Sequence, residues 1–206
     1  MSKVLILVLA MALQMSSAFQ PARVASSPFG DMPYASRAAG VVVLEVDVDE
    51  RGTVRGVNTI KDLEPFGPVL RNAVQSWRFE PARADGRAVE HPVLVAGLFR
   101  PAAVMFPAPP PPPPPPANAP ESIPYPIEFG IPPFPPNRIG TAAVLVGVEI
   151  DARGTVTDAQ IVGDTTGFDD ASLDAARRWV FRPAQYNRRD VPSRAYLLFV
   201  FRQPAM

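Results

Sequence analysis

The sequence predicts an α+β fold that is built twice. We expect two small domains, each a three-stranded antiparallel sheet with a helix on one face, joined by a polyproline linker. Two repeated segments predict this arrangement. The segment Val43–Val54 returns 102 residues later as Leu145–Val156, and Trp-x-Phe-x-Pro-Ala at Trp77–Ala82 returns at Trp179–Ala184. The proline run Pro109–Pro116 lies between the two copies and marks them as separate units.

The first strand of each copy is marked by alternating apolar residues. Such alternation, with a period of two over seven or eight residues, is typical of a half-buried strand. Acidic residues occupy most of the opposite face, as expected for a face turned to solvent. The apolar positions are Val42, Leu44, Val46 and Val48 in the first copy, and Val144, Val146, Val148 and Ile150 in the second.

A tight turn and a second strand follow in both copies. Asp49–Gly52 and Asp151–Gly154 have aspartate first and glycine last, which suits a type I turn whose glycine takes the left-handed conformation. The next strands are Thr53–Ile60 and Thr155–Val162, so each copy begins with a hairpin. The apolar parity then slips by one residue, which predicts a β-bulge at the same point in both copies: Val54 to Val57, and Val156 to Ala159.

A helix and a third strand complete each copy, in the order β-β-α-β. Asp169 or Asp170 is a candidate N-cap for the second helix, and Pro68 suits the first turn of the other one. The third strands are Val93–Phe99 and Ala195–Phe201. Each is expected beside the first strand of its copy, which leaves strands two and three as edges. The apolar helix stripes are Leu70, Ala73, Val74 and Trp77, and Leu173, Ala176 and Val180.

Composition excludes several classes of function. The formal net charge of the 206 residues is zero and the pI is near 6.6, so there is no basic footprint for nucleic acid. The absence of cysteine excludes disulfides and thiolate metal sites. The single histidine, His91, has no partners for a triad or a metal site, and is expected to be exposed or locally hydrogen-bonded. No nucleotide-binding or nucleophile motif occurs, so we expect no enzyme activity, catalytic residue, metal or cofactor.

The amino terminus predicts export. Lys3 precedes the short apolar run Val4–Leu13, and small residues follow at Ser16–Ala18. This pattern is typical of a secretory signal peptide cleaved after Ala18, and the apolar run is too short to span a membrane. The alternative is an uncleaved segment that anchors the protein in the inner membrane, the only case in which we expect membrane contact.

These patterns divide the chain into five parts. The eight prolines of the linker are expected to form a polyproline II rod of about 25 Å. The segment before the first copy is rich in proline and serine and is expected to be flexible. The parts are a signal peptide (1–18), a flexible segment (19–37), copy one (38–101), a proline-rich linker (102–137) and copy two (138–206).

The repeated motifs resemble the TonB C-terminal domain family. The resemblance is closest in copy two, and copy one departs from the pattern at its helix start, Glu64–Pro68. The chain also differs from founding members of the family, whose amino-terminal membrane helix carries a functional histidine. The matching residues of copy two are Asp151, Gly154, Val156, Leu173, Asp174, Ala176, Trp179, Phe181, Pro183 and Ala184.

The resemblance implies a periplasmic protein associated with outer-membrane transport. Family members pair an edge strand with an extended segment of an outer-membrane TonB-dependent receptor, a case of β-augmentation. The candidate edge is the last strand, because it is apolar on both faces. An alternative is a structural envelope protein, whose strand is covered by copy one or by a homodimer partner. The candidate residues are Ala195, Tyr196, Leu197, Leu198, Phe199, Val200 and Phe201.

Overall fold

The computed structural model describes residues 19–36, 38–99, 119–163 and 166–203. The predicted signal peptide and the proline run 109–116 lie outside the described residues. The elements, in chain order, are β1 (Arg23–Ser26), β2 (Gly40–Val48), β3 (Val54–Lys61), α1 (Phe66–Gln75), β4 (Arg78–Glu80), β5 (Ala82–Ala84), β6 (Arg87–Val89), β7 (His91–Phe99), β8 (Tyr125–Glu128), β9 (Ala142–Ile150), β10 (Val156–Val162), α2 (Asp169–Ala176), β11 (Val180–Arg182), β12 (Ala184–Tyr186), β13 (Arg189–Val191) and β14 (Ser193–Phe201).

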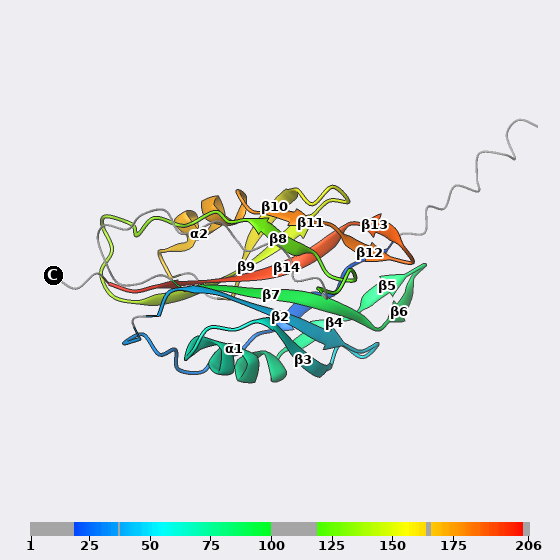
Figure 1. Cartoon of the computed structure of the whole chain (residues 1–206), viewed down its shortest axis with the longest axis horizontal. Coiled ribbons are helices and arrows are strands. Elements are labelled where there is room, and N and C mark those ends of the chain that lie inside the picture. Colours follow the sequence, from blue (N-terminus) through cyan, green and yellow to red (C-terminus); the bar gives the residue numbers. More distant parts are fainter. Residues whose placement is uncertain (1–18, 37, 100–118, 164–165, 204–206) are drawn as a thin grey trace, which may run out of the picture.

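The long strands of both copies form one six-stranded sheet (Figure 1), in the order β10-β9-β14-β7-β2-β3. In each copy the third strand lies beside the first, as predicted. The expectation of two separate three-stranded sheets is wrong, because β14 and β7 pair with each other. They run parallel, from Ala195 opposite Leu94 to Val200 opposite Phe99. The two copies therefore share one continuous sheet.

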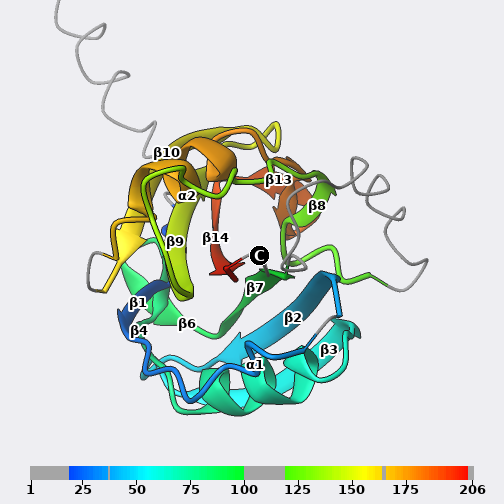
Figure 2. The ribbon, with the colours of Figure 1, turned by 90° about the vertical axis from the view of Figure 1, so that its left-hand side faces the viewer.

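The two helices cover opposite faces of this sheet (Figure 2). On the α1 face, Phe66 and Leu70 pack with residues of both copies, among them Tyr196 and Leu198 of β14. On the α2 face, the core takes in Leu94 and other residues of β7. The opposite placement of the helices follows from the parallel pairing of β14 with β7. Rotation about an axis along these strands relates the two copies, and this rotation turns their helices to opposite faces of the sheet. Each hydrophobic core is thus built from both copies.

The turns and bulges match the prediction. Gly52 and Gly154 have φ values of 77° and 86°. The register of the first hairpin shifts between Asp47 and Val48, and that of the second between Val156 and Asp158, so one extra residue stands in each second strand. The bulge explains why the apolar parity changes without a change of sheet face.

The predicted cap of α2 needs a correction. The N-cap residue is Phe168, which makes no side-chain cap hydrogen bond, and Asp169 and Asp170 lie inside the first turn. The Asp169 carboxylate instead accepts hydrogen bonds from the backbone N–H groups of Thr166 and Gly167, at 3.1 and 3.2 Å. Both acids still lie at the positive end of the helix dipole, where negative charge is favourable.

The segments before the two copies contain strands of their own. Residues 19–36 were expected to be flexible, but β1 pairs with β4. Part of the expected linker likewise forms β8, which pairs with β11. β1 and β8 occupy equivalent places, 102 residues apart. Each copy is therefore preceded by an arm that contributes a strand about twenty residues before the repeated motif.

Each arm is tied to the tryptophan of its own copy. The indole N–H of Trp77 donates to the Pro28 carbonyl at 3.2 Å, and that of Trp179 donates to the Gly130 carbonyl at 2.8 Å. The rings also contact Phe29 and Phe129. Both tryptophans are buried, as predicted for core residues. The repeated Trp thus fixes an arm as well as filling the core.

Candidate functional site

The predicted binding strand, Ala195–Phe201, is not an edge. It lies within β14, which pairs with β9 on one side and with β7 on the other. All seven residues are buried. The strand is apolar on both faces because each face meets a hydrophobic core, one under α1 and one under α2. Of the two interpretations of this strand, coverage by copy one is confirmed, and a peptide cannot add to it in this arrangement.

The open edges of the sheet are the second strands. β3 and β10 each have one strand neighbour in the six-stranded sheet. Their sequences are polar and short: Arg55, Asn58 and Thr59 of β3 are exposed, as are Thr157, Asp158 and Gln160 of β10. Polar side chains are one of the ways in which natural proteins keep an edge strand from aggregating. These two edges are where another chain could add to the sheet.

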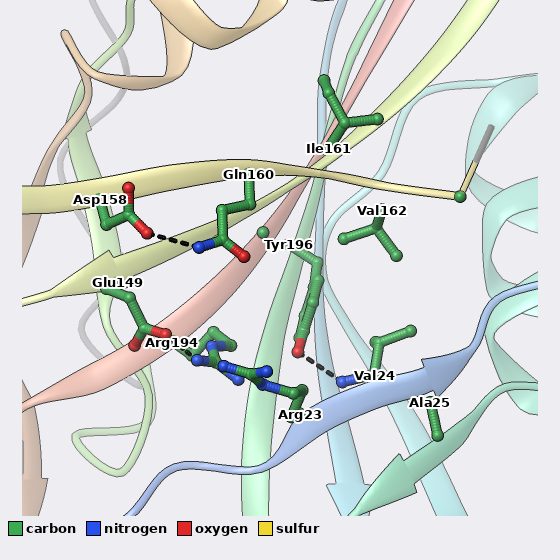
Figure 3. Close-up of a pocket in the computed structure, with 12 residues that line it drawn as sticks. Arg23, Val24, Ala25, Glu149, Asp158, Gln160, Ile161, Val162, Arg194 and Tyr196 are labelled. Atoms are coloured by element: carbon green, nitrogen blue, oxygen red, sulfur yellow. Dashed lines mark hydrogen bonds and ion pairs between the residues drawn. The ribbon is translucent and has the colours of Figure 1, made fainter. Parts of the chain in front are cut away.

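A cavity of about 300 Å³, which we name the Gly147 pocket, lies beside the β10 edge (Figure 3). Strands β9, β10 and β14 of copy two form one part of its lining, and the β1 arm of copy one forms the other. It exists only because the two copies share a sheet. The lining residues are Arg23, Val24, Ala25, Gly147, Glu149, Asp158, Gln160, Ile161, Val162, Gly163, Arg194 and Tyr196.

One end of the Gly147 pocket is charged. Arg194 forms an ion pair with Glu149, which stands directly opposite it on the neighbouring strand. On β10, the Gln160 amide donates to the Asp158 carboxylate at 2.8 Å. Arg23 reaches in from β1 on the same side as Arg194 (Figure 3). Among the described residues no ion pair includes Arg23.

Tyr196 joins the arm to the sheet. Its hydroxyl accepts a hydrogen bond from the backbone N–H of Val24 at 2.6 Å and contacts the Ala22 carbonyl at 3.5 Å. Burial raises the pKa of this phenol, and hydrogen bonding to Val24 and the positive charge of Arg194 oppose that rise. The phenol stays neutral at physiological pH and can hold the arm of copy one against β14 of copy two.

His91 is buried and locally hydrogen-bonded, the second of the two expected environments. Its Nδ1 lies 2.9 Å from the Pro92 carbonyl, and burial lowers its pKa. The ring packs beside Phe19 and Tyr186, so it touches both the arm and copy two. No cluster of metal-ligating side chains occurs among the described residues. His91 therefore has a packing role at the junction of the copies.

The acidic residues of the first strands fall into two groups. Asp49 and Asp151 close their turns, and the backbone N–H groups of Thr53 and Thr155 hold the pKa of these carboxyls below the usual range. Glu45 and Asp47 are half-buried, and burial raises the pKa of both. The predicted solvated face is therefore only partly exposed, and Glu149 and Asp151 of copy two are half-buried as well. In copy one the arm that carries β8 packs near this face, since Ser122 is a hydrogen-bond partner of Glu45.

A comparison with known protein families agrees with the two repeats. The family described as Gram-negative bacterial TonB protein C-terminal matches the chain twice, at residues 33–101 and 140–202. The chain belongs to this family, with two copies of the domain. No match was found among curated proteins or solved structures. In the part of the chain that the structure describes, no helix has the length and apolar character needed to cross a membrane.

Sequence reasoning missed the residues that form the Gly147 pocket. Arg23 belongs to a segment expected to be flexible, and Arg194 has proline at the equivalent position in copy one, Pro92. One signal could have revealed the arms. Phe29–Tyr34 and Phe129–Phe134 share the pattern Phe-Gly-x-x-Pro-aromatic, and in both the Phe packs on the tryptophan of its copy.

Proposed function

We propose that this chain is a periplasmic module that binds an extended segment of an envelope protein by adding it to the β10 edge of the sheet. An outer-membrane TonB-dependent receptor is the proposed partner, in line with family membership and its relation to outer-membrane transport. Such pairing draws affinity from main-chain hydrogen bonds and specificity from pockets for alternate side chains. The observation that carries the proposal is an open edge strand, β10, with a cavity beside it.

The β10 edge is favoured over β3 because of its surroundings. Asp158 and Gln160 project from β10 over the Gly147 pocket (Figure 3), so the edge and the cavity are continuous. The place equivalent to this pocket beside β3 holds the Glu45 side chain, which accepts a hydrogen bond from Asn58 at 3.3 Å. A partner strand that adds to β10 would therefore lie beside an open pocket. A partner strand that adds to β3 would lie beside a place that the Glu45 side chain already fills.

Proline substitution tests the edge. Proline removes one backbone donor and is tolerated in a strand only where that donor faces outward. Neighbouring amides alternate in direction, so Ala159→Pro and Gln160→Pro remove donors on opposite sides of β10. One variant should unfold, as seen by circular dichroism, and the other should stay folded.

Partner binding is then measured by photo-crosslinking in the cell envelope. A photoreactive amino acid at Thr157, an exposed residue of β10, should crosslink to a receptor, and the folded proline variant should abolish that product. Asn58 in β3 provides the matched position. Crosslinks to a receptor that survive the folded proline variant would exclude β10 as the binding edge.

A second candidate function has its own supporting observation. The parallel pairing of β14 with β7 buries, within one chain, the strand that the sequence predicted to bind a partner. This favours a structural envelope protein whose copies bind each other and have no energy-transducing role. Crosslinks from both Thr157 and Asn58 that yield only the protein itself would support this alternative.

A further inference from the structure

The Gly147 pocket owes its space to a glycine that the backbone does not require. Gly147 is absent from the glycines with positive φ. A Cβ atom placed there would meet Tyr196 and Val162 at 3.4 Å, which is ordinary van der Waals contact. An alanine would therefore fit the strand without strain. The consequence of glycine at this position is an open hollow between β10 and the β1 arm.

Copy one shows what fills the equivalent place. Position 45, which is 102 residues before Gly147, is a glutamate. Its carboxylate, carried on two methylene groups, accepts a hydrogen bond from the amide of Asn58, the residue opposite it on the neighbouring strand. In copy two the residue opposite Gly147 is Gln160, which is again an amide. The amide donor is present in both copies, and the carboxylate is present in one.

Two cations of the Gly147 pocket have uncharged residues at the equivalent positions of copy one. Arg23 has Tyr125 as its counterpart, and Arg194 has Pro92. Glu149 neutralises Arg194, whereas no ion pair of the described residues includes Arg23. The Gln160 amide uses one N–H for Asp158 and has a second to donate. The Arg23 guanidinium and the Gln160 amide thus both line the empty volume, and the Asp158 carboxylate lies beside the amide.

We propose that the Gly147 pocket binds a carboxylate carried on a short aliphatic chain, which takes the place that the Glu45 side chain fills in copy one. The Arg23 guanidinium and the Gln160 amide hold the carboxylate, and the aliphatic chain lies over Gly147 between Val24 and Val162. A volume of about 300 Å³ is enough for such a group and lies at the lower limit of ligand pockets. Binding of a carboxylate in this pocket does not require that a strand adds to β10.

Propionate is the probe, because it is the glutamate side chain without its backbone. Titrated into the isotope-labelled full chain, it should shift the amide resonances of Gly147 and Gln160 in a saturable way. Propionamide, which has the same shape without the charge, should not. Arg23→Gln should weaken propionate binding about tenfold, the loss expected for one charge-assisted hydrogen bond.

Two variants separate the pocket from the fold. Gly147→Ala should keep the melting temperature while it reduces binding, and Gly147→Glu should abolish binding by supplying the carboxylate itself. Saturable shifts with propylamine and none with propionate would assign the pocket to Asp158 and overturn the proposal. So would the absence of saturable shifts with either probe, or propionate binding that Arg23→Gln leaves unchanged.

A peptide arm identifies the source of the carboxylate. A blocked pentapeptide, Thr-Val-Glu-Val-Thr, is compared with its Gln counterpart. Tighter binding of the Glu peptide, competed by propionate, assigns the pocket to an acidic side chain of a protein partner. Propionate binding with no difference between the peptides assigns it to a free small acid. Failure of strand addition at β10 would leave the propionate result unchanged, so the two proposals fail separately.

Discussion

Glu45 in copy one and Gly147 in copy two occupy equivalent places, yet one fills its surroundings and the other leaves them open. The strands that carry them share the turn, the bulge after it and the register around Glu45 and Gly147, and β3 has a second register shift, opposite Val43 and Leu44, that β10 lacks. The arms that pass over them differ: β1 brings Arg23 and β8 brings Tyr125, over whose ring the Arg182 guanidinium lies at 5.9 Å from the centroid. Duplication kept the framework and changed what lies beside each open edge.

The third strands teach the opposite lesson, because β7 and β14 play the same part. Each pairs with the first strand of its copy and with the other third strand. A small domain buries too little surface to be stable alone, and these two copies complete each other's cores. The two copies are therefore equivalent at the centre of the sheet, where β7 and β14 pair, and they differ beside the edge strands.

The largest expected effect comes from the turn glycines. A Cβ atom at Gly52 would lie 1.7 Å from the Phe79 carbonyl oxygen, and one at Gly154 would lie 1.7 Å from that of Phe181. Alanine at either position must move the backbone, in addition to a left-handed cost of about 1–2 kcal/mol. Gly52→Ala and Gly154→Ala should each lower the melting temperature by more than about 8 °C.

Gly86→Ala is the matched control for the turn glycines. Gly86 has the same φ of 77° as Gly52, but nothing lies within 4 Å of its Cβ position. Its melting temperature should fall by only about 2–4 °C, the effect of about 1 kcal/mol in a body of this size. Equal losses for Gly86→Ala and Gly52→Ala would show that the Phe79 carbonyl does not constrain the turn.

A medium effect is expected at the two tryptophans. Trp179→Phe and Trp77→Phe remove the same volume and the same N–H donor. The lost bond at Trp179 is shorter and fully buried, 2.8 Å against 3.2 Å. An unpaired buried carbonyl costs about 1–3 kcal/mol, so urea unfolding should show the larger loss for Trp179→Phe. A larger loss for Trp77→Phe would mean that the first arm is held more tightly than the second.

The smallest effect expected is a difference in pH dependence between two acids. The pKa of Asp151 is lowered in the folded chain, so its stabilising effect is present above the ordinary aspartate pKa of about 3.9 and is lost as pH falls. The pKa of Glu45 is raised, so ionised Glu45 destabilises the fold as pH rises above about 4.3.

Asparagine and glutamine variants should therefore have opposite effects. At pH 7 Asp151→Asn should be less stable than the parent chain and Glu45→Gln more stable. Both differences should shrink as the pH approaches 3. Glu45 is then protonated in both the folded and the unfolded state, and the stabilising effect of ionised Asp151 is lost as the pH falls toward its lowered pKa. Thermal melts at pH 7, 5 and 3 measure this. A loss of stability at pH 7 for Glu45→Gln would show that its hydrogen bond to Asn58 outweighs burial.

Local features of the fold were predictable from the sequence, and the joining of the copies was not. The alternation of apolar residues predicted the first strands, and Asp49 and Gly52 predicted the turn. Both features depend only on residues that are neighbours in the sequence. The partner of Ala195–Phe201 depends on residues about 100 positions away in another copy. An apolar strand shows that something covers it and does not show what.

The arms were not predicted, for a related reason. Arg23–Ser26 and Tyr125–Glu128 occupy equivalent places but share no residue type at any position. Their strands form through backbone pairing with β4 and β11, which needs little from the side chains. The candidate site was missed for the same reason. Arg23 lines the pocket only because the arm lies beside Gly147, and the position of the arm was not predicted.

Residue-resolved hydrogen exchange of β14 tests the account most directly. A strand paired on both sides has all its amides bonded, whereas an edge strand leaves every second amide open to water. We predict that every amide from Ala195 to Phe201 exchanges slowly, and that β10 shows slow and fast amides in alternation. Alternating fast exchange along Ala195–Phe201 would contradict the shared sheet and return that strand to its predicted place as the binding edge.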